Sequence, residues 1–146
     1  MCSSYEQIAN LIARYAFATD DGDFAALGAL FARGRLALNG GEPVSGAAGI
    51  AGLAEAVLQT YEGGSLRTRH VTTNLFIDVD EDAGTARSRS YFTVFQSLPE
   101  LPLQPIAAGH YQDRFARVDG RWCFAERAVV TDFSGDVSHH VRAAAH

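Results

Sequence analysis

Apolar residues recur at intervals of three and four along the first third of the chain, which is the spacing of one face of an α-helix. Near the start, Ile8, Leu11, Ile12 and Tyr15 follow this spacing, and serines with a glutamate three residues later resemble a helix N-cap. An acidic segment over 20–23, in which Gly22 can turn the chain, interrupts the pattern. Helices are therefore predicted over 5–19, 24–31 and 46–61.

After residue 65 the pattern changes to alternating segments rich in Val, Thr, Tyr and Phe, separated by the turn-forming residues of 80–84 and 119–120. Such segments are typical of antiparallel hairpins. Strands are predicted over 67–79, 85–97, 103–118 and 121–133, with a short one over 35–38. The proline-bearing stretch 98–105 is predicted to be a mobile loop.

Helices followed by a long meander indicate an α+β domain rather than a doubly wound one. We expect a single domain over 1–146, with three N-terminal helices packed on a strongly curved antiparallel sheet. A curved sheet covered by helices leaves one internal pocket at its mouth.

Composition narrows the possible chemistry. All 12 basic residues are arginines, so the chain has no lysine for Schiff-base catalysis or for a phosphate-binding P-loop. The net charge of -5 and the scattered arginines argue against nucleic-acid binding, and no apolar run is long enough to span a membrane. No leader-like segment precedes the first predicted helix, so a cytoplasmic location and a hydrophobic small-molecule partner are expected.

Several motifs that could bind a cofactor or a metal lack the residue spacing that such binding needs. The glycine-rich run 40–52 lacks the spacing and the preceding buried strand of a dinucleotide site, and the acidic segment 20–23 lacks the ligand spacing of a calcium loop. Cys2 and Cys123 make neither a disulfide framework nor a zinc site. His139 and His140 are expected in a solvated tail, and no metal site is predicted.

His70 lies in a predicted strand where the even positions 70, 72 and 74 are all polar. If this face lines the pocket, it offers an imidazole, a hydroxyl and an amide to a ligand; if it faces water, it belongs to an ordinary amphipathic strand. Histidine is well suited to proton transfer near neutral pH, and a carboxylate partner would fix its tautomer. Asp20, at the end of the first predicted helix, is the candidate partner.

Arg127 lies among apolar residues in the last predicted strand, while Tyr111 and Asp113 share one face of the strand before it. A guanidinium in apolar surroundings needs a carboxylate or a ligand anion. Arg127 is thus either the structural partner of Asp113 or a stabiliser of a developing oxyanion.

The chain resembles the SnoaL-like branch of the nuclear transport factor 2-like superfamily in three segments and in their order. These are the helix-turn-helix segment 15–24, the Arg69-His70 pair and the segment 119–124. The resemblance implies a cone-shaped fold with one internal pocket. Members that are dehydratases or dehydrochlorinases use an Asp-His pair and a pocket arginine, at positions that match Asp20, His70 and Arg127. Where some members carry a first-helix lysine, this chain has Tyr15.

The resemblance implies a cofactor-independent lyase or isomerase (dehydratase, double-bond isomerase or cyclase) acting on a hydrophobic cyclic molecule such as a polyketide, a steroid-like compound or a terpenoid. The expected catalytic residues are His70, Asp20 and Arg127, and those expected to contact substrate are Tyr15, Phe24, Asn74, Tyr91, Tyr111 and Asp113. The alternative is a non-catalytic module, either a ligand carrier or a protein like an oxygenase small subunit.

A homodimer is also expected, because related cones often pair through the outer face of the sheet. Val71, Leu75 and Ile77 would supply its apolar face. The same alternation equally suits burial of these residues under the helices.

Overall fold

The computed structural model describes residues 2–142 and contains the three predicted helices: α1 (Ser4–Asp21), α2 (Phe24–Ala29) and α3 (Ala47–Val57). The Ser3 hydroxyl accepts a hydrogen bond from the Glu6 backbone N–H at the start of α1, as the sequence predicts for an N-cap. None of the helices within 2–142 is long and apolar enough to span a bilayer.

The strands form one six-stranded sheet in the order β2-β1-β6-β5-β4-β3. Their bounds are β1 (Arg35–Leu38), β2 (Val44–Ser45), β3 (Thr68–Asp80), β4 (Thr85–Leu98), β5 (Leu101–Val118) and β6 (Arg121–Ser134). The four long strands form the predicted antiparallel meander, but β1 pairs with β6 in parallel, so the sheet is mixed and does not close. The two-residue β2 is too short to leave a sequence pattern.

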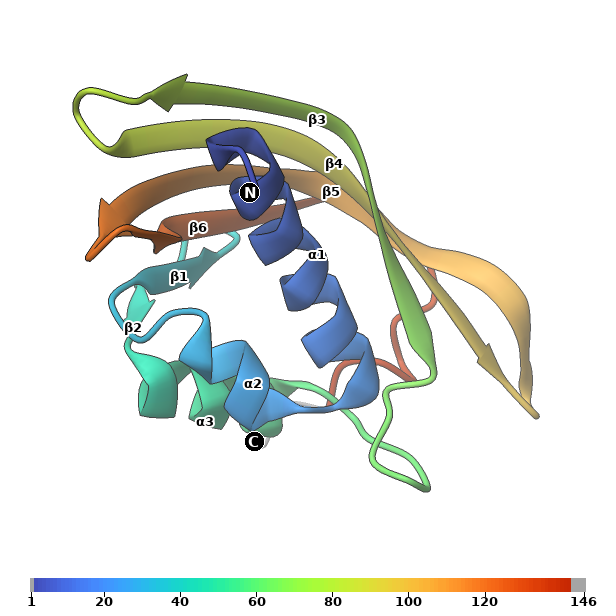
Figure 1. Cartoon of the computed structure of the whole chain (residues 1–146). Helices are drawn as coiled ribbons and strands as arrows, with labels where there is room; N and C mark the ends of the chain where they lie inside the picture. The colour runs from blue at the N-terminus through green and yellow to red at the C-terminus, as the bar shows by residue number, and fades with distance from the viewer. Residues whose placement is uncertain (1, 143–146) are drawn as a thin grey trace.

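The long strands bend around the helices, which all lie on the concave side of the sheet (Figure 1). Apolar side chains of α1 and α2 meet those of β4, β5 and β6 in this concavity and form the core, as the burial of Ile8, Leu27 and Phe124 shows. The fold is therefore the predicted α+β cone. The predicted loop over 98–105 is wrong: β4 and β5 pair as far as Leu98 and Leu101 and turn tightly between them.

A β-bulge in β3 shifts the side-chain alternation between Thr73 and Phe76, where Asn74 takes a positive φ of 55°. Before the bulge His70 points inward and Val71 is exposed; after it Ile77 packs against the core. Of the two alternatives for Leu75 and Ile77, burial under the helices is confirmed and the outer apolar face is wrong, because the extra residue turns both toward the core. Phe76 is exposed in their place.

Candidate active site

Asp20 lies in the last turn of α1, at the point where this helix meets the start of β3. Gly22 ends the helix in the left-handed conformation (φ 70°), and a side chain there would collide with the backbone carbonyl of Gly64. The backbone oxygen of Asp20 accepts a hydrogen bond from the Leu66 N–H at 3.0 Å. This close approach fixes the end of α1 against β3 and aims the Asp20 side chain at the strand.

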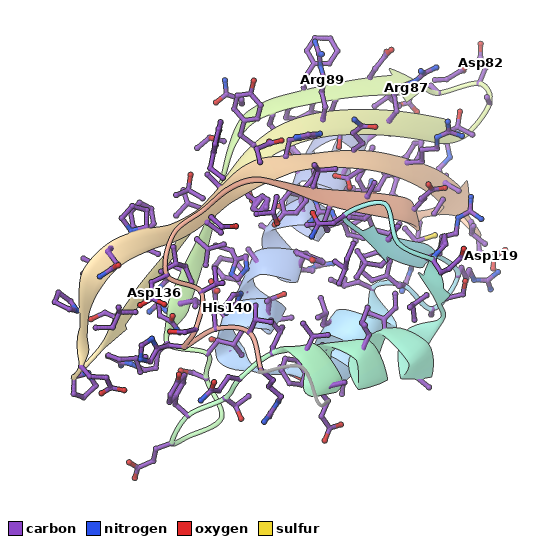
Figure 2. The ribbon with its side chains drawn as sticks, turned by 180° about the vertical axis from the view of Figure 1, so that it is seen from behind. Asp82, Arg87, Arg89, Asp119, Asp136 and His140 are labelled. Carbon is purple, nitrogen blue, oxygen red and sulfur yellow. The ribbon has the colours of Figure 1, made fainter. Side chains whose placement is uncertain are left out.

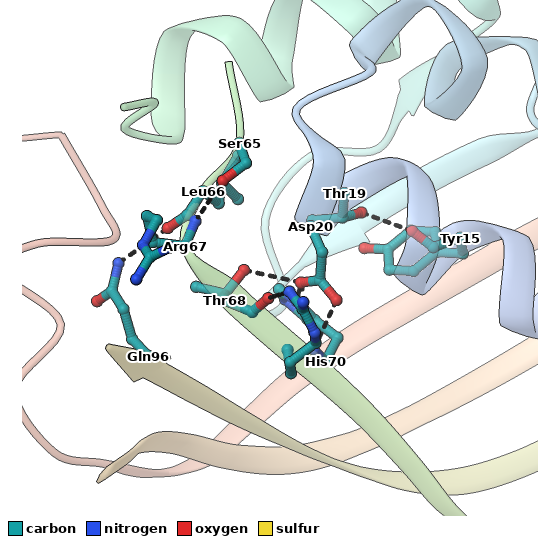
Figure 3. A network of polar contacts seen from close by, with 10 residues as sticks. Tyr15, Thr19, Asp20, Ser65, Leu66, Arg67, Thr68, His70 and Gln96 are labelled. Atoms are coloured by element: carbon teal, nitrogen blue, oxygen red, sulfur yellow. Dashed lines mark hydrogen bonds and ion pairs between the residues drawn. The ribbon is translucent and has the colours of Figure 1, made fainter. Parts of the chain in front are cut away.

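The Asp20 carboxylate receives hydrogen bonds from two residues of β3 (Figure 3). The Thr68 hydroxyl donates to Oδ1 at 2.7 Å, and the His70 backbone N–H donates to Oδ2 at 2.9 Å. The His70 ring nitrogen Nδ1 lies 2.6 Å from Oδ1. Side-chain exposure is only 8% for His70 and 7% for Asp20. The structure thus brings the two predicted residues into direct, buried contact.

This environment keeps Asp20 ionised. Burial by itself would raise its pKa, but the hydrogen bonds from the ring and backbone of His70, with that from the Thr68 hydroxyl, lower the pKa below the ordinary value. A carboxylate can only accept hydrogen bonds, so we infer that His70 carries a proton on Nδ1. In the neutral ring, Nε2 is then the nitrogen without a proton and remains available to a ligand. The pair has the form of a general base held in one tautomer by a carboxylate.

His70 contributes to the wall of a cavity of about 350 Å³ that lies between the helices and the concave face of the sheet. The lining is mainly aliphatic and aromatic, with residues from every helix and from strands β1, β3, β4, β5 and β6. Its polar side chains are Tyr15, Thr19, Asn39, His70, Tyr111, Thr131, Ser134 and His140. An apolar cavity with few polar groups suits a hydrophobic small molecule that is oriented by one or two hydrogen bonds.

Tyr15 and Tyr111, which were expected to contact substrate, both line this cavity, with their rings edge to face at 5.7 Å. Both phenols are buried, which raises their pKa values above the ordinary range, so they are neutral hydrogen-bonding groups at neutral pH. Beneath them lies the guanidinium of Arg127, 4.2 Å from the Tyr15 ring centre and 3.7 Å from that of Tyr111.

Arg127 does not line the cavity, contrary to the oxyanion role expected for it. Its Nε and Nη2 donate to the two carboxylate oxygens of Asp113 at 2.8 and 2.9 Å, and neither side chain is exposed. Burial would lower the pKa of Arg127, but the Asp113 carboxylate raises it above its ordinary value. The alternative of a structural ion pair therefore describes Arg127, and Asp113 is likewise removed from the substrate-contacting set.

Three further residues expected to contact substrate lie elsewhere. Tyr91 is 58% exposed because the inward positions of β4 are the even ones. Arg87 and Arg89, at other odd positions of this strand, point away from the helices (Figure 2). Asn74 is exposed at the β3 bulge. Phe24 packs against the core at the start of α2, outside the cavity lining.

His140 is a site residue that the sequence pattern did not reveal. It was expected in a solvated tail, yet it is 8% exposed and lines the cavity, and its ring lies 5.7 Å from that of His70. The only available signal was a pair of adjacent histidines near the C-terminus, in a segment without periodicity. Within residues 2–142 no cluster of three or more His, Cys, Asp or Glu side chains is arranged to hold a metal ion.

Comparison with known proteins identifies the family of the chain. The SnoaL-like domain family matches residues 1–128. Among curated proteins there is no match to this sequence. The chain also shares its fold with many solved structures, among them three with 22–24% sequence identity.

One is an NTF2-like protein with a cystatin-like fold from Novosphingobium aromaticivorans, with 24% identity and a TM-score of 0.73, covering 92% of this chain and 85% of that one. The second, from the same organism and assigned as a scytalone dehydratase, has 24% identity and a TM-score of 0.72, with coverage of 96% and 90%. The third, a hexachlorocyclohexane dehydrochlorinase, has 22% identity and a TM-score of 0.74, with coverage of 98% and 91%. At these identities the structures show a shared fold only. The family match spans most of the chain, and the protein belongs to the SnoaL-like domain family.

Proposed function

We propose that this protein is a cofactor-independent lyase or isomerase in which Asp20 and His70 transfer a proton within a hydrophobic cyclic molecule. The observation that carries the proposal is the 2.6 Å contact between His70 Nδ1 and Asp20 Oδ1 at the wall of an apolar cavity. The names of two structural neighbours, a dehydratase and a dehydrochlorinase, support it, because both reactions remove a proton from carbon.

The proposed reaction begins with His70 Nε2 removing a proton from a carbon next to a carbonyl group. The electrons of the C–H bond form a new carbon–carbon double bond, and the carbonyl π electrons move onto oxygen to give an enolate. Asp20 stabilises the imidazolium that forms, in the manner of the carboxylate in a catalytic triad. Returning the proton to another carbon gives an isomer, whereas returning it to a departing hydroxyl group gives water elimination.

The experiment is to measure deuterium exchange at the activated C1 position of 2-tetralone in D2O by proton NMR. 2-Tetralone is a bicyclic apolar ketone with an acidic α-carbon, so it requires only the first proposed step. We expect the wild-type protein to accelerate exchange well above the buffer rate. A rate equal to that of buffer with 2-tetralone bound in the cavity would contradict the proposal and favour the ligand-carrier alternative.

We further propose that the protein forms a homodimer through the outer face of its sheet. Strand pairing places Val71 and Thr93 in one row with Ala108 and Phe133, next to a row that contains Tyr91. Val71, Tyr91 and Phe133 are 40%, 58% and 74% exposed, so this outer face leaves three large apolar side chains open to solvent. Light scattering should report a dimer that Tyr91→Arg converts to a monomer; a monomeric wild type would contradict the proposal.

A further inference from the structure

The segment after β6 contributes Val137, His140 and Val141 to the cavity lining and is tied to three parts of the fold. The carbonyl oxygen of His139 accepts hydrogen bonds from the Tyr61 hydroxyl and from Gln96 Nε2, the latter at 3.1 Å. The carbonyl oxygen of His140 accepts one from the Gln59 N–H at 2.9 Å. The Arg142 N–H donates to the Val57 carbonyl oxygen at the end of α3. Residues 136–142, here called the C-terminal strap, therefore have a fixed position.

The strap brings His140 into the cavity wall on the concave side of the sheet (Figure 2). The His140 and His70 rings are inclined at 55° with their centres 5.7 Å apart, so the two imidazoles are neighbours. His140 lies beyond residue 128, where the match to the family ends.

The His140 side chain is neutral and incompletely hydrogen-bonded. Burial, and then the charge of His70, lower its pKa to about 4, with Asp20 opposing the shift. Its Nδ1 is buried and has no hydrogen-bond partner among the described residues. An enclosed N–H without an acceptor is costly, which assigns the ring proton to Nε2.

We propose that His140 is a second catalytic residue, whose neutral imidazole N–H donates a hydrogen bond to the substrate oxygen that gains negative charge when His70 removes the proton. This inference rests on the proposed function of the Asp20 and His70 pair. In the enolisation step the proton moves from carbon to His70 Nε2, and the negative charge comes to lie on oxygen. The Nε2 proton of His140 stays bound to nitrogen throughout.

Two features favour this role over a purely structural one. A carbonyl oxygen is only two bonds from its α-carbon, so two adjacent imidazoles can contact the two atoms at once. A neutral imidazole donor also avoids a second positive charge beside the imidazolium of His70, which a protonated His140 would place there. The arrangement needs no lysine or arginine in the cavity wall.

The test compares the binding of 2-naphthol with that of naphthalene by fluorescence titration. 2-Naphthol is a stable aromatic analogue of the enol of 2-tetralone, and naphthalene lacks only its hydroxyl group. The ratio of the two affinities isolates the hydroxyl contact from general effects on the cavity. We expect a ratio of about fivefold to tenfold for the wild type, the range of one additional hydrogen bond. His140→Phe should reduce the ratio to about one, and His140→Gln, which keeps an N–H donor, should restore part of it.

His139→Phe is the matched control, because it changes the adjacent histidine, whose side chain contacts Ser138 and is outside the cavity lining. Its affinity ratio should equal that of the wild type. His70→Ala should abolish 2-tetralone exchange, whereas the His140 contact is tested by the affinity ratio of His140→Phe with His70 intact, so failure of the His140 role and failure of the proposed function give different results. A ratio near one in the wild type, or an unchanged ratio in His140→Phe, overturns the inference.

If His140→Phe does not fold, two other measurements test the inference. One is the affinity ratio of His140→Gln, and the other is the NMR shift of the wild-type His140 and His139 ring signals on binding 2-naphthol. The inference requires a shift at His140 larger than that at His139.

Discussion

His70 and Asp20 are 50 positions apart in the chain, yet the imidazole Nδ1 of the first lies 2.6 Å from the carboxylate Oδ1 of the second. Three further hydrogen bonds fix the contact: two from Thr68 and the His70 backbone to the carboxylate, and one from Leu66 to the backbone carbonyl of Asp20. These hydrogen bonds fix the positions of both side chains before a ligand binds. A general base requires such a preorganised geometry.

Thr68→Val should lower the free energy of unfolding by about 1 kcal/mol at pH 7, because it removes the buried hydrogen bond to Asp20 and leaves the volume nearly unchanged. Because the pKa of Asp20 is lower in the folded than in the unfolded chain, its ionised carboxylate stabilises the fold at pH values above its unfolded pKa. That stabilisation is lost as the pH falls toward the folded pKa. The difference from wild type should therefore shrink below about pH 4. Urea unfolding at several pH values measures it, with Thr72→Val as the control on the same strand; equal losses in the two variants would contradict the assignment.

Arg127→Met should destabilise the protein by about 3–5 kcal/mol, because it leaves the Asp113 carboxylate buried without its partner. Replacing both residues, as in Arg127→Met with Asp113→Leu, should recover part of that loss. Thermal or urea unfolding of the single and double variants checks the expectation. A single variant with normal stability but no exchange activity would instead support the oxyanion role that the position of Arg127 argues against.

Val129→Trp should fill the cavity and weaken binding of naphthalene at least tenfold, since Val129 lines the cavity wall. Val130→Trp is its matched control, because the next residue of the strand is outside the cavity lining and should leave binding unchanged. Fluorescence titration with naphthalene distinguishes the two. Similar affinities in both variants would mean that apolar ligands bind elsewhere.

The buried His140 should make stability depend on pH. Its pKa of about 4 in the folded chain is below the value of about 6.5 expected when it is unfolded, and the titratable groups that face it are His70 and Asp20. Between these values the unfolded chain binds the additional proton, so stability rises with pH across this window, by up to about 3 kcal/mol. In His140→Phe the rise should be smaller by that amount. Urea unfolding at pH values from 4 to 7 measures both slopes, and parallel curves would contradict the burial of a neutral His140.

Much of the fold could be predicted because each long element has a strong hydrophobic period. The three helices and the two hairpins follow from spacings of three to four and of two residues. The parallel pairing of β1 with β6 could not be predicted, because it depends on tertiary contact between two segments far apart in the chain. The stretch 98–105 was misjudged because its prolines disfavour a central strand, whereas here they occupy the end of a hairpin.

Site residues could be predicted only where polar side chains interrupt an apolar pattern. His70 and Asp20 were predicted from such interruptions and from the family resemblance. The prediction for Tyr91 was wrong because apolar side chains usually occupy the inner face of a strand. In β4 the polar residues Ser88 and Ser90 are buried on that face, and the tyrosine is on the outer face. A one-residue bulge changed the face of Asn74, and His140 reaches the cavity only through the path of the strap. Neither the bulge nor the path of the strap produces a periodic pattern of apolar residues in the sequence.

The most direct test of the account is the 2-tetralone exchange rate of Asp20→Asn relative to wild type. The asparagine amide can donate a hydrogen bond to His70 Nδ1, which would place the imidazole proton on Nε2 and block proton abstraction. We predict a loss of about 10²- to 10⁴-fold in exchange rate, with the affinity for naphthalene unchanged and the fold intact by circular dichroism. A folded Asp20→Asn protein that exchanges 2-tetralone as fast as wild type would contradict the account.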